Sequence, residues 1–301
     1  MDKHHLNNNT PFHFSFLRDA TTPGFYISDF KNCFSKYPFL ISQHKFDFYS
    51  LAYFIKGEGT FHINNKSFKI KPNRIFLCPQ NIAHALRFSK TPEGVYTFVC
   101  QDFYAAEFNM IRLMYLFSYA LPIANKEPIY YIDLPEKNTE IAHMFHTLLL
   151  ESNSKQLHHA PIIRSYLNIL ILKLTDICES HNNNKSDETN AIIIKLSYLI
   201  ESNYSKQTKH DFYAQSLQVS LARLNSICKN VFNMSLKKII QQRIMIEIRK
   251  LLEETDISVA EIAFKFNFSD DSYFNKVFKS HTHLSPGKYR ELHQKMKKRF
   301  L

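Results

Sequence analysis

The sequence predicts a multidomain α+β protein in which a small β-barrel is followed by helices and then by an all-α C-terminal region. Three observations predict this fold class. Short strand-like runs separated by turns lie between residues 46 and 100. Apolar residues recur at helical spacing between residues 141 and 178. One helical pattern occurs twice in the last third of the 301 residues, a length that suits about two domains.

The barrel is predicted over residues 21–105, behind a flexible arm at residues 1–20. Its first run, Phe46–Ile55, is followed by a turn at Gly57-Glu58-Gly59. Strands of four to ten residues at regular spacing are typical of a sandwich or barrel. The other strand-like runs are Thr60–Ile63, Ser67–Ile70, Ile75–Cys78 and Val95–Cys100.

Two motifs in this region resemble the cupin barrel. They are Tyr53-Phe54-Ile55-x-Gly57-x-Gly59 and Pro79-x-Asn81-x-x-His84, with Asn81 in place of the cupin glycine. Enzymatic cupins hold a metal through an H-x-H pair, a glutamate and the final histidine, and of these only His84 is present. One imidazole does not hold a catalytic metal, so we expect no metal, no cofactor and no enzymatic activity.

A barrel without a metal can still bind a small molecule at its mouth. The polar side chains that could orient such a ligand are His44, Tyr53, Arg74 and His84. For each of them a structural role, such as capping of a strand end by His84, is the alternative interpretation.

Residues 106–180 are predicted to be helical. Ile141, Phe145, Leu148 and Leu149 follow helical spacing within 141–152, and a second amphipathic helix covers 162–178. Helices with wide apolar faces can pack on the barrel or pair with a second subunit, so we assign this segment to dimerisation. The polar run from His181 to Glu188 predicts a linker over 181–190.

The remaining domain, 191–301, contains the repeated pattern. Ala214-x-x-Leu217-x-Val219-Ser220 recurs 49 residues later as Ala263-x-x-Phe266-x-Phe268-Ser269. Each copy predicts a short helix, a tight turn and a second helix capped by Ser220 or Ser269. Two such units joined by a long amphipathic helix, from Ser235 to about Glu254, indicate tandem helix-turn-helix motifs.

Further residues predict how these helices begin and end. We expect Asp211 to cap the first helix of the first unit, and Ser258 with Glu261 to form a capping box at the second unit. Asn233, Asn267 and His283 stand at turns that usually contain glycine. Asn tolerates a left-handed backbone better than most other residues do.

Positive charge is concentrated in the same region. Residues 191–301 contain 19 Lys and Arg against 10 Asp and Glu, while the other 190 residues contain 19 against 17. Lys and Arg near phosphates release condensed counterions, which makes double-stranded DNA the expected partner. The connecting helix, at roughly 28 Å, suits recognition helices about 34 Å apart in successive major grooves.

The best-preserved stretch resembles the DNA-binding domain of the AraC/XylS family of bacterial transcription regulators. It is Ile262-Ala263-x-x-Phe266-x-Phe268-Ser269-x-x-x-Tyr273-Phe274-x-x-Val277-Phe278-Lys279, followed by Leu284-Ser285-Pro286-x-x-Tyr289-Arg290. The resemblance covers residues 211–290, and a cupin-like sensor is the family's common N-terminal partner. It implies a sequence-specific regulator, a homodimer on DNA, and a small-molecule effector and RNA polymerase as further partners.

Candidate DNA contacts lie on the outer faces of the two recognition helices. Asn can bond adenine bidentately and Lys can reach guanine, although each residue could also be an ordinary exposed polar residue. Ala222 and Ser226 offer little base-reading chemistry, so the first unit is expected to contact phosphates or thymine methyl groups. The candidates are Ala222, Arg223, Asn225, Ser226, Lys229, Asp271, Ser272, Asn275, Lys276 and Lys279.

Other classes of protein fit the sequence less well. The five cysteines show neither a disulfide framework nor zinc-ligand spacing, and residues 1–9 contain no apolar core of a signal peptide. No apolar run is long enough to span a bilayer, so a cytoplasmic protein is expected. The alternatives are a regulator without a small-molecule effector, whose barrel serves only for dimerisation or partner contact, and a metal-dependent cupin enzyme, which the missing metal ligands disfavour.

Overall fold

The computed structural model describes residues 11–300 except 18–19, 21, 106–109, 122–126, 136–138, 155, 157, 182–186, 207–208, 269 and 283. The chain divides into two compact units, Met1–Lys185 (unit 1) and Ser186–Leu301 (unit 2). Of the predicted linker, 182–186 lie outside the described residues, and residues 187–190 form the first turn of a helix.

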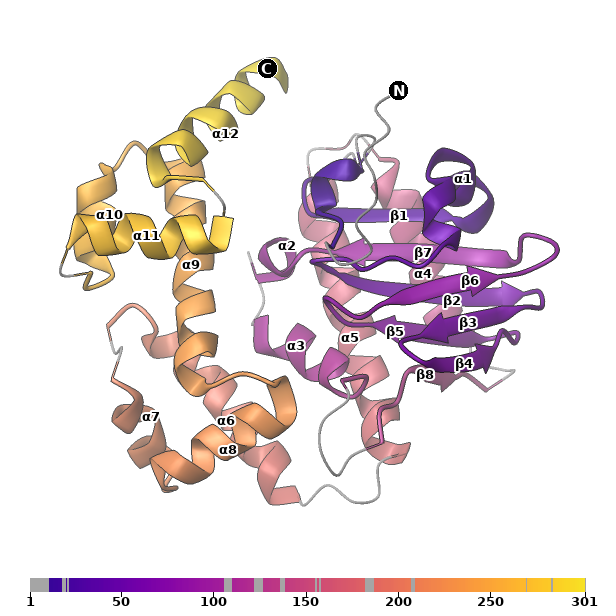
Figure 1. Cartoon of the computed structure of the whole chain (residues 1–301), viewed down its shortest axis with the longest axis horizontal. Helices are drawn as coiled ribbons and strands as arrows, with labels where there is room; N and C mark the ends of the chain where they lie inside the picture. Colours follow the sequence, from indigo (N-terminus) through magenta and orange to yellow (C-terminus); the bar gives the residue numbers. More distant parts are fainter. Residues whose placement is uncertain are drawn as a thin grey trace. The chain divides into compact units, whose positions relative to one another are not determined.

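The described part of unit 1 contains eight strands in two antiparallel sheets. The larger sheet has the order β1-β7-β2-β5-β8, and the smaller has the order β4-β3-β6 (Figure 1). The strands are β1 (Phe25–Asp29), β2 (Tyr49–Lys56), β3 (Thr60–Ile63), β4 (Lys66–Lys69), β5 (Arg74–Cys78), β6 (His84–Arg87), β7 (Glu93–Val99) and β8 (Tyr131–Asp133).

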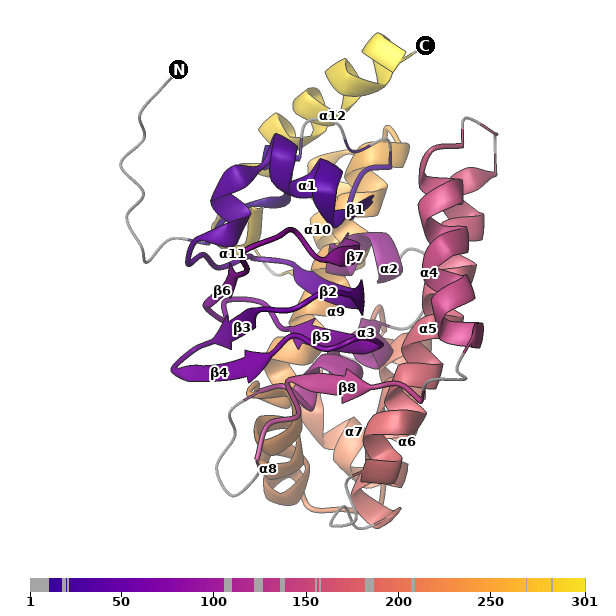
Figure 2. The same cartoon turned by 90° about the vertical axis from the view of Figure 1, so that its right-hand side faces the viewer.

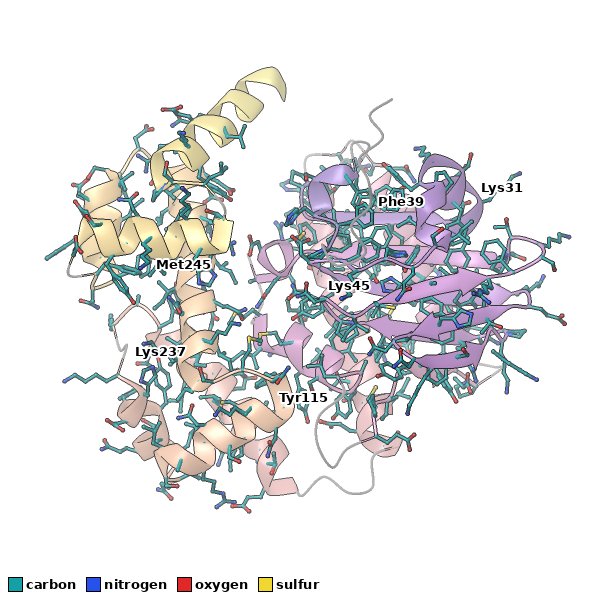
Figure 3. All side chains as sticks on the ribbon, viewed as in Figure 1. Lys31, Phe39, Lys45, Tyr115, Lys237 and Met245 are labelled. Carbon is teal, nitrogen blue, oxygen red and sulfur yellow. The ribbon has the colours of Figure 1, made fainter. Side chains whose placement is uncertain are left out.

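Side chains fill the space between the two sheets (Figure 3), and many of the buried ones in this unit are aromatic. The ring of Phe61 on β3 stacks on that of Phe76 on β5, with 4.3 Å between centroids. Tyr96 and Phe98, both on β7, lie 4.5 Å apart, and all four side chains are buried. Full burial of such a ring contributes about 1.5–3 kcal/mol. The predicted barrel is thus confirmed as two facing sheets around an apolar core.

Residues 11–17 pack on this barrel, although the sequence predicted a flexible arm there. The amide of Phe12 donates to the carbonyl of Lys45 (2.8 Å), and the amide of Asp47 donates to the carbonyl of Phe12 (3.1 Å). A short 3-10 helix, η1 (Phe14–Phe16), follows, and Leu17 is buried. The apolar side chains at alternate positions of this segment are partly buried, and their burial holds the segment on the barrel. The prediction of a flexible arm did not take this apolar pattern into account.

Helices of unit 1 cover one face of the larger sheet. α4 (Thr139–Ser152) and α5 (His159–His181) lie against the face turned away from the smaller sheet (Figure 2). The ring of Tyr53 on β2 stacks on Phe145 of α4 at 4.9 Å. These are the two predicted helices, slightly extended. The others are α1 (Phe30–Lys36), η2 (Pro38–Ile41), α2 (Gln101–Ala105) and α3 (Met110–Ser118).

The sequence predicted helices throughout residues 106–180, but this segment is not wholly helical. Strand β8 lies within it and pairs with β5, so that Tyr131 faces Phe76 across the ladder. Three residues are too few to produce a recognisable strand pattern, and only the distant partner strand defines them. Among the described residues, none of the helices is both long and apolar enough to cross a membrane.

The regular secondary structure in the described part of unit 2 is all helical. α7 (His210–Ser216) with α8 (Leu221–Phe232), and α10 (Val259–Lys265) with α11 (Asp271–Thr282), are the two predicted helix-turn-helix motifs. α9 (Leu236–Glu254) joins them (Figure 1). α6 (Asp187–Asn203) precedes the first motif, and α12 (Pro286–Phe300) follows the second.

Most predicted caps of these helices are confirmed. The hydroxyls of Ser220 and Ser235 accept amides three residues on, and Ser258 forms the complete capping box with Glu261. The prediction for Asp211 was wrong, because α7 begins at His210 without a side-chain cap and Asp211 lies inside its first turn. Ser269 lies outside the described residues. The amides of Ser272 and Tyr273 donate to Asp270, which caps α11.

The two motifs share one turn geometry. Gln218 and Asn267 have left-handed backbones, with φ of 55° and 59°. The amide that follows each of them bonds back across the turn, Val219 to Ala214 (3.1 Å) and Phe268 to Ala263 (3.0 Å). The repeat in the sequence is therefore a repeat in structure. Asn233, also left-handed, ends α8 as predicted, while His283 lies outside the described residues.

Candidate nucleic-acid interface

The two recognition helices, α8 and α11, bury one face and expose the other. Leu224, Ile227 and Val231 of α8, and Phe274, Val277 and Phe278 of α11, are buried in unit 2. Nearly all the predicted contact residues lie on the opposite faces. The exposed ones are Ala222, Arg223, Ser226 and Lys229 on α8, and Asp271, Ser272, Asn275, Lys276 and Lys279 on α11.

Asn225 is the exception. Its side chain is half-buried, and its amide oxygen accepts the backbone N–H of Leu236, the first residue of α9, at 3.2 Å. That bond satisfies one of the donors left open at a helix N-terminus. Asn225 therefore ties α8 to α9, a structural role that its place on the outer face did not predict.

Lysines provide the free positive charge of this surface. Lys229, Lys276 and Lys279 are exposed, and no carboxylate among the described residues pairs with them. Arg223, by contrast, forms an ion pair with Glu188 of α6 at 2.8 Å. Unpaired lysines on recognition helices are suited to phosphates and to guanine O6 and N7.

The start of α11 is ordered by its own side chains. Asp270 accepts the first amides of the helix, and the Nδ2 group of Asn275 donates to the carbonyl of Asp271 at 2.8 Å. Tyr273, which was not predicted as a contact residue, is 50% exposed on the same helix. Its neighbour Phe274 faces the core, so helical geometry places Tyr273 well away from the buried face.

The surface between α9 and α11 is also basic. Burial lowers the pKa of His281, and the positive charges of Arg249 and Lys238 lower it further. Three groups that can carry positive charge therefore lie close enough to repel one another. With its pKa lowered, His281 is uncharged at neutral pH, and Arg249 and Lys238 are the charged groups beside it.

In unit 1, the structure brings His44 and His84 together. Their rings lie 4.2 Å apart, and their backbones pair in both directions. Nδ1–H of His44 donates to the carbonyl of Ser42 (2.7 Å), and that of His84 to Ile82 (3.0 Å). The hydroxyl of Tyr96 then donates to Nε2 of His84 (3.0 Å). Both imidazoles are neutral in this arrangement.

Burial dominates the titration of this pair. Burial lowers the pKa of His84 to about 4 and also lowers the pKa of His44, which a protonated His84 would lower further. Nε2 of His44 is buried without a hydrogen-bond partner among the described residues. No group of three His, Cys, Asp or Glu side chains in the described part of the chain is placed to hold a metal ion.

Tyr53 and Arg74 lie elsewhere, so the four predicted ligand-binding residues do not form one site. Tyr53 faces α4, and its hydroxyl donates to Asn73 (3.2 Å). Arg74 binds both carboxylate oxygens of Asp133 (2.6 and 2.7 Å), donates to the carbonyl of Lys69 (2.7 Å) and stacks on Tyr131. Arg74 therefore holds β8 to the sheet.

Comparisons with known proteins agree with this architecture. The family model of the AraC-like ligand binding domain matches residues 32–160, and that of a helix-turn-helix domain matches residues 213–292. The Probable transcription factor PqrA of Proteus vulgaris is 32% identical over 83 residues, which are 28% of this chain and 68% of that protein. The chain belongs to the AraC family of transcription regulators.

Other AraC-family members are similar over more of the chain. The Msm operon regulatory protein of Streptococcus mutans is 24% identical over 247 residues, which are 81% of this chain and 84% of that protein. Among solved structures, ToxT from Vibrio cholerae covers 89% of this chain and 98% of its own at 14% identity and a TM-score of 0.40. The protein described in this structure is thus an AraC-family regulator with an N-terminal ligand-binding domain and a C-terminal helix-turn-helix DNA-binding domain.

Proposed function

We propose that the protein recognises specific sites in duplex DNA by placing α8 and α11 in successive major grooves. The observation that carries this proposal is the pair of identically built motifs, each exposing the polar face of its second helix. The 19 residues of α9 span roughly 28 Å, close to the 34 Å of one duplex turn. Both helices could then read one face of the DNA.

Unit 2 alone is expected to bind duplex DNA. The fragment should include α6, because Glu201 of that helix bonds Arg243 of α9. Affinity should fall steeply with salt, by a slope of about 0.9 in log Kd per phosphate contact. Fluorescence anisotropy of residues 186–301 at several salt concentrations measures this. Absence of binding, or binding that salt does not weaken, would count against the assignment.

We expect the second motif to supply most of the sequence discrimination. Lys276→Ala and Asn275→Ala should each weaken binding to the specific site by about 1–3 kcal/mol, with little loss on random DNA. Ser226→Ala is the matched control on α8, where one hydroxyl adds little discrimination. Equal losses from both helices, or equal losses on both kinds of DNA, would refute this division of labour.

Unit 1 is proposed to dimerise through the outer face of α4 and α5. Leu150, Ile169 and Leu172 are 60%, 42% and 40% exposed there. Ile169→Glu should raise the dimer dissociation constant by about 100-fold or more, because it would bury a charge in an apolar interface. Analytical ultracentrifugation of the full chain measures the effect. Lys71→Glu, an exposed site remote from these helices, is the control, and a monomeric wild-type protein would exclude the proposal.

We propose that unit 1 also binds a small-molecule effector, as its family assignment suggests. A polar cavity of about 450 Å³, lined by His62, Asn64, Arg87 and others, is one candidate for the site. A ligand that binds only the folded state raises Tm, so a thermal-shift screen tests this. If no compound raises Tm, dimerisation remains the role of unit 1.

A DNA-binding regulator of this kind would act in the cytoplasm, and RNA polymerase is a further expected partner of the protein.

A further inference from the structure

We propose that Glu188 is an autoinhibitory group that competes with DNA for Arg223. The inference rests on the proposed function, since it concerns a residue of the first recognition helix. In the structure, Nη2 of Arg223 lies 2.8 Å from a carboxylate oxygen of Glu188. The two side chains are 50% and 65% exposed, so both remain accessible to solvent and to a phosphate.

The position of Arg223 makes this competition matter. It is the third residue of α8, and its amide donates to the hydroxyl of Ser220 at 3.1 Å, which fixes the start of the helix. The first turns of a recognition helix are the part that reaches bases and flanking phosphates. A guanidinium held there by a carboxylate is not available for a DNA phosphate.

The position of Glu188 gives the contact a regulatory character. It lies in the first turn of α6, directly after residues 182–186, which join the two units. Further along, α6 is anchored in unit 2 by buried Ile193 and Leu196 and by the bonds between Glu201 and Arg243. The first turn is therefore the end of α6 that lies nearest in the sequence to unit 1.

The contact is weak enough to be reversible. An exposed ion pair typically shifts an equilibrium by a factor of only about one to five. If Arg223 contacts the DNA backbone as proposed, the Glu188 carboxylate beside it also repels the phosphates, and this repulsion adds to the competition. Together the two effects predict that removal of the charge strengthens DNA binding by about 3- to 10-fold.

The test compares Glu188→Gln with the wild type in the full-length protein, using the duplex that the wild type selects from a random pool. We expect Kd to fall by about 3- to 10-fold, and the slope of log Kd against log salt to steepen by about one, because Arg223 releases one more counterion. In an Arg223→Gln background, Glu188→Gln should change Kd by less than about twofold. Glu254→Gln, which neutralises an exposed acid at the last position of α9, controls for the general change in charge of unit 2.

Each other outcome has a definite meaning. Weaker or unchanged binding by Glu188→Gln would overturn the inference, as would equal tightening in the Arg223→Gln background or by Glu254→Gln. A wild-type protein that selects no duplex would instead refute the proposed function. Thermal unfolding of all variants should match the wild type within a few degrees, since the pair is exposed.

Discussion

Unit 1 is expected to lose stability as the pH falls from 6.5 to about 4, because two buried histidines must stay neutral in its folded state. Burial lowers the pKa of His84 to about 4, against an ordinary value of about 6.5 in the unfolded chain. Below pH 6.5 the unfolded chain therefore binds protons that the folded one does not. The loss reaches about 3 kcal/mol near pH 4 from His84 alone, and His44 adds to it.

Urea unfolding at pH 7.5, 5.5 and 4.5 measures this loss, and hydrogen exchange of β6 assigns it to unit 1. The double variant His44→Phe, His84→Gln should be less stable at pH 7.5 but much less sensitive to acid. His146→Gln, which removes an exposed histidine of α4, should keep the wild-type pH dependence. A wild-type stability that is constant across this range would show that the pair does not control it.

Replacement of Arg243 by Met is expected to destabilise unit 2 by about 2–4 kcal/mol. The buried guanidinium donates to Glu201 at 2.7, 3.0 and 3.1 Å and to Glu247 at 3.2 Å, and it stacks on Tyr204. Breaking a buried ion pair costs about 3–5 kcal/mol. The expected loss is smaller here because Glu201 is 37% exposed and solvent screens its charge. Tm should fall by roughly 10 °C or more.

Two variants sharpen this experiment. Arg243→Lys keeps the charge but loses the forked geometry of the guanidinium. Its Tm should therefore lie between that of Arg243→Met and that of the wild type. Lys250→Met, at an exposed position of the same helix, removes one positive charge without a buried partner. If Arg243→Met melts within about two degrees of the wild type, the α6–α9 contact does not stabilise unit 2.

Local signals predicted unit 2 well. α8 begins after the predicted cap Ser220, continues with apolar residues at helical spacing and ends at the predicted turn residue Asn233. These signals act within a few residues of one another. The role of Asn225 escaped prediction because its partner, the amide of Leu236, belongs to the next helix.

Long-range pairing explains what the sequence did not predict in unit 1. Strands β1, β6 and β8 are three to five residues long, and ladders with distant strands define them. Arg74 was one of four candidates for orienting a ligand, with a structural role as the alternative, and the structure gives it the partner Asp133, 59 residues away. A buried cation indicates that it has an anionic partner. When that partner is far away in the sequence, the sequence alone does not show which carboxylate it is.

The aromatic filling between the two sheets has a kinetic consequence. With rings such as Phe61 and Phe76 only 4.3 Å apart, a molecule can enter this space only after the rings have separated. Association would then be limited by the rate of that opening and not by diffusion. A molecule that entered there would therefore bind slowly and leave slowly, since its departure requires the same separation of the rings.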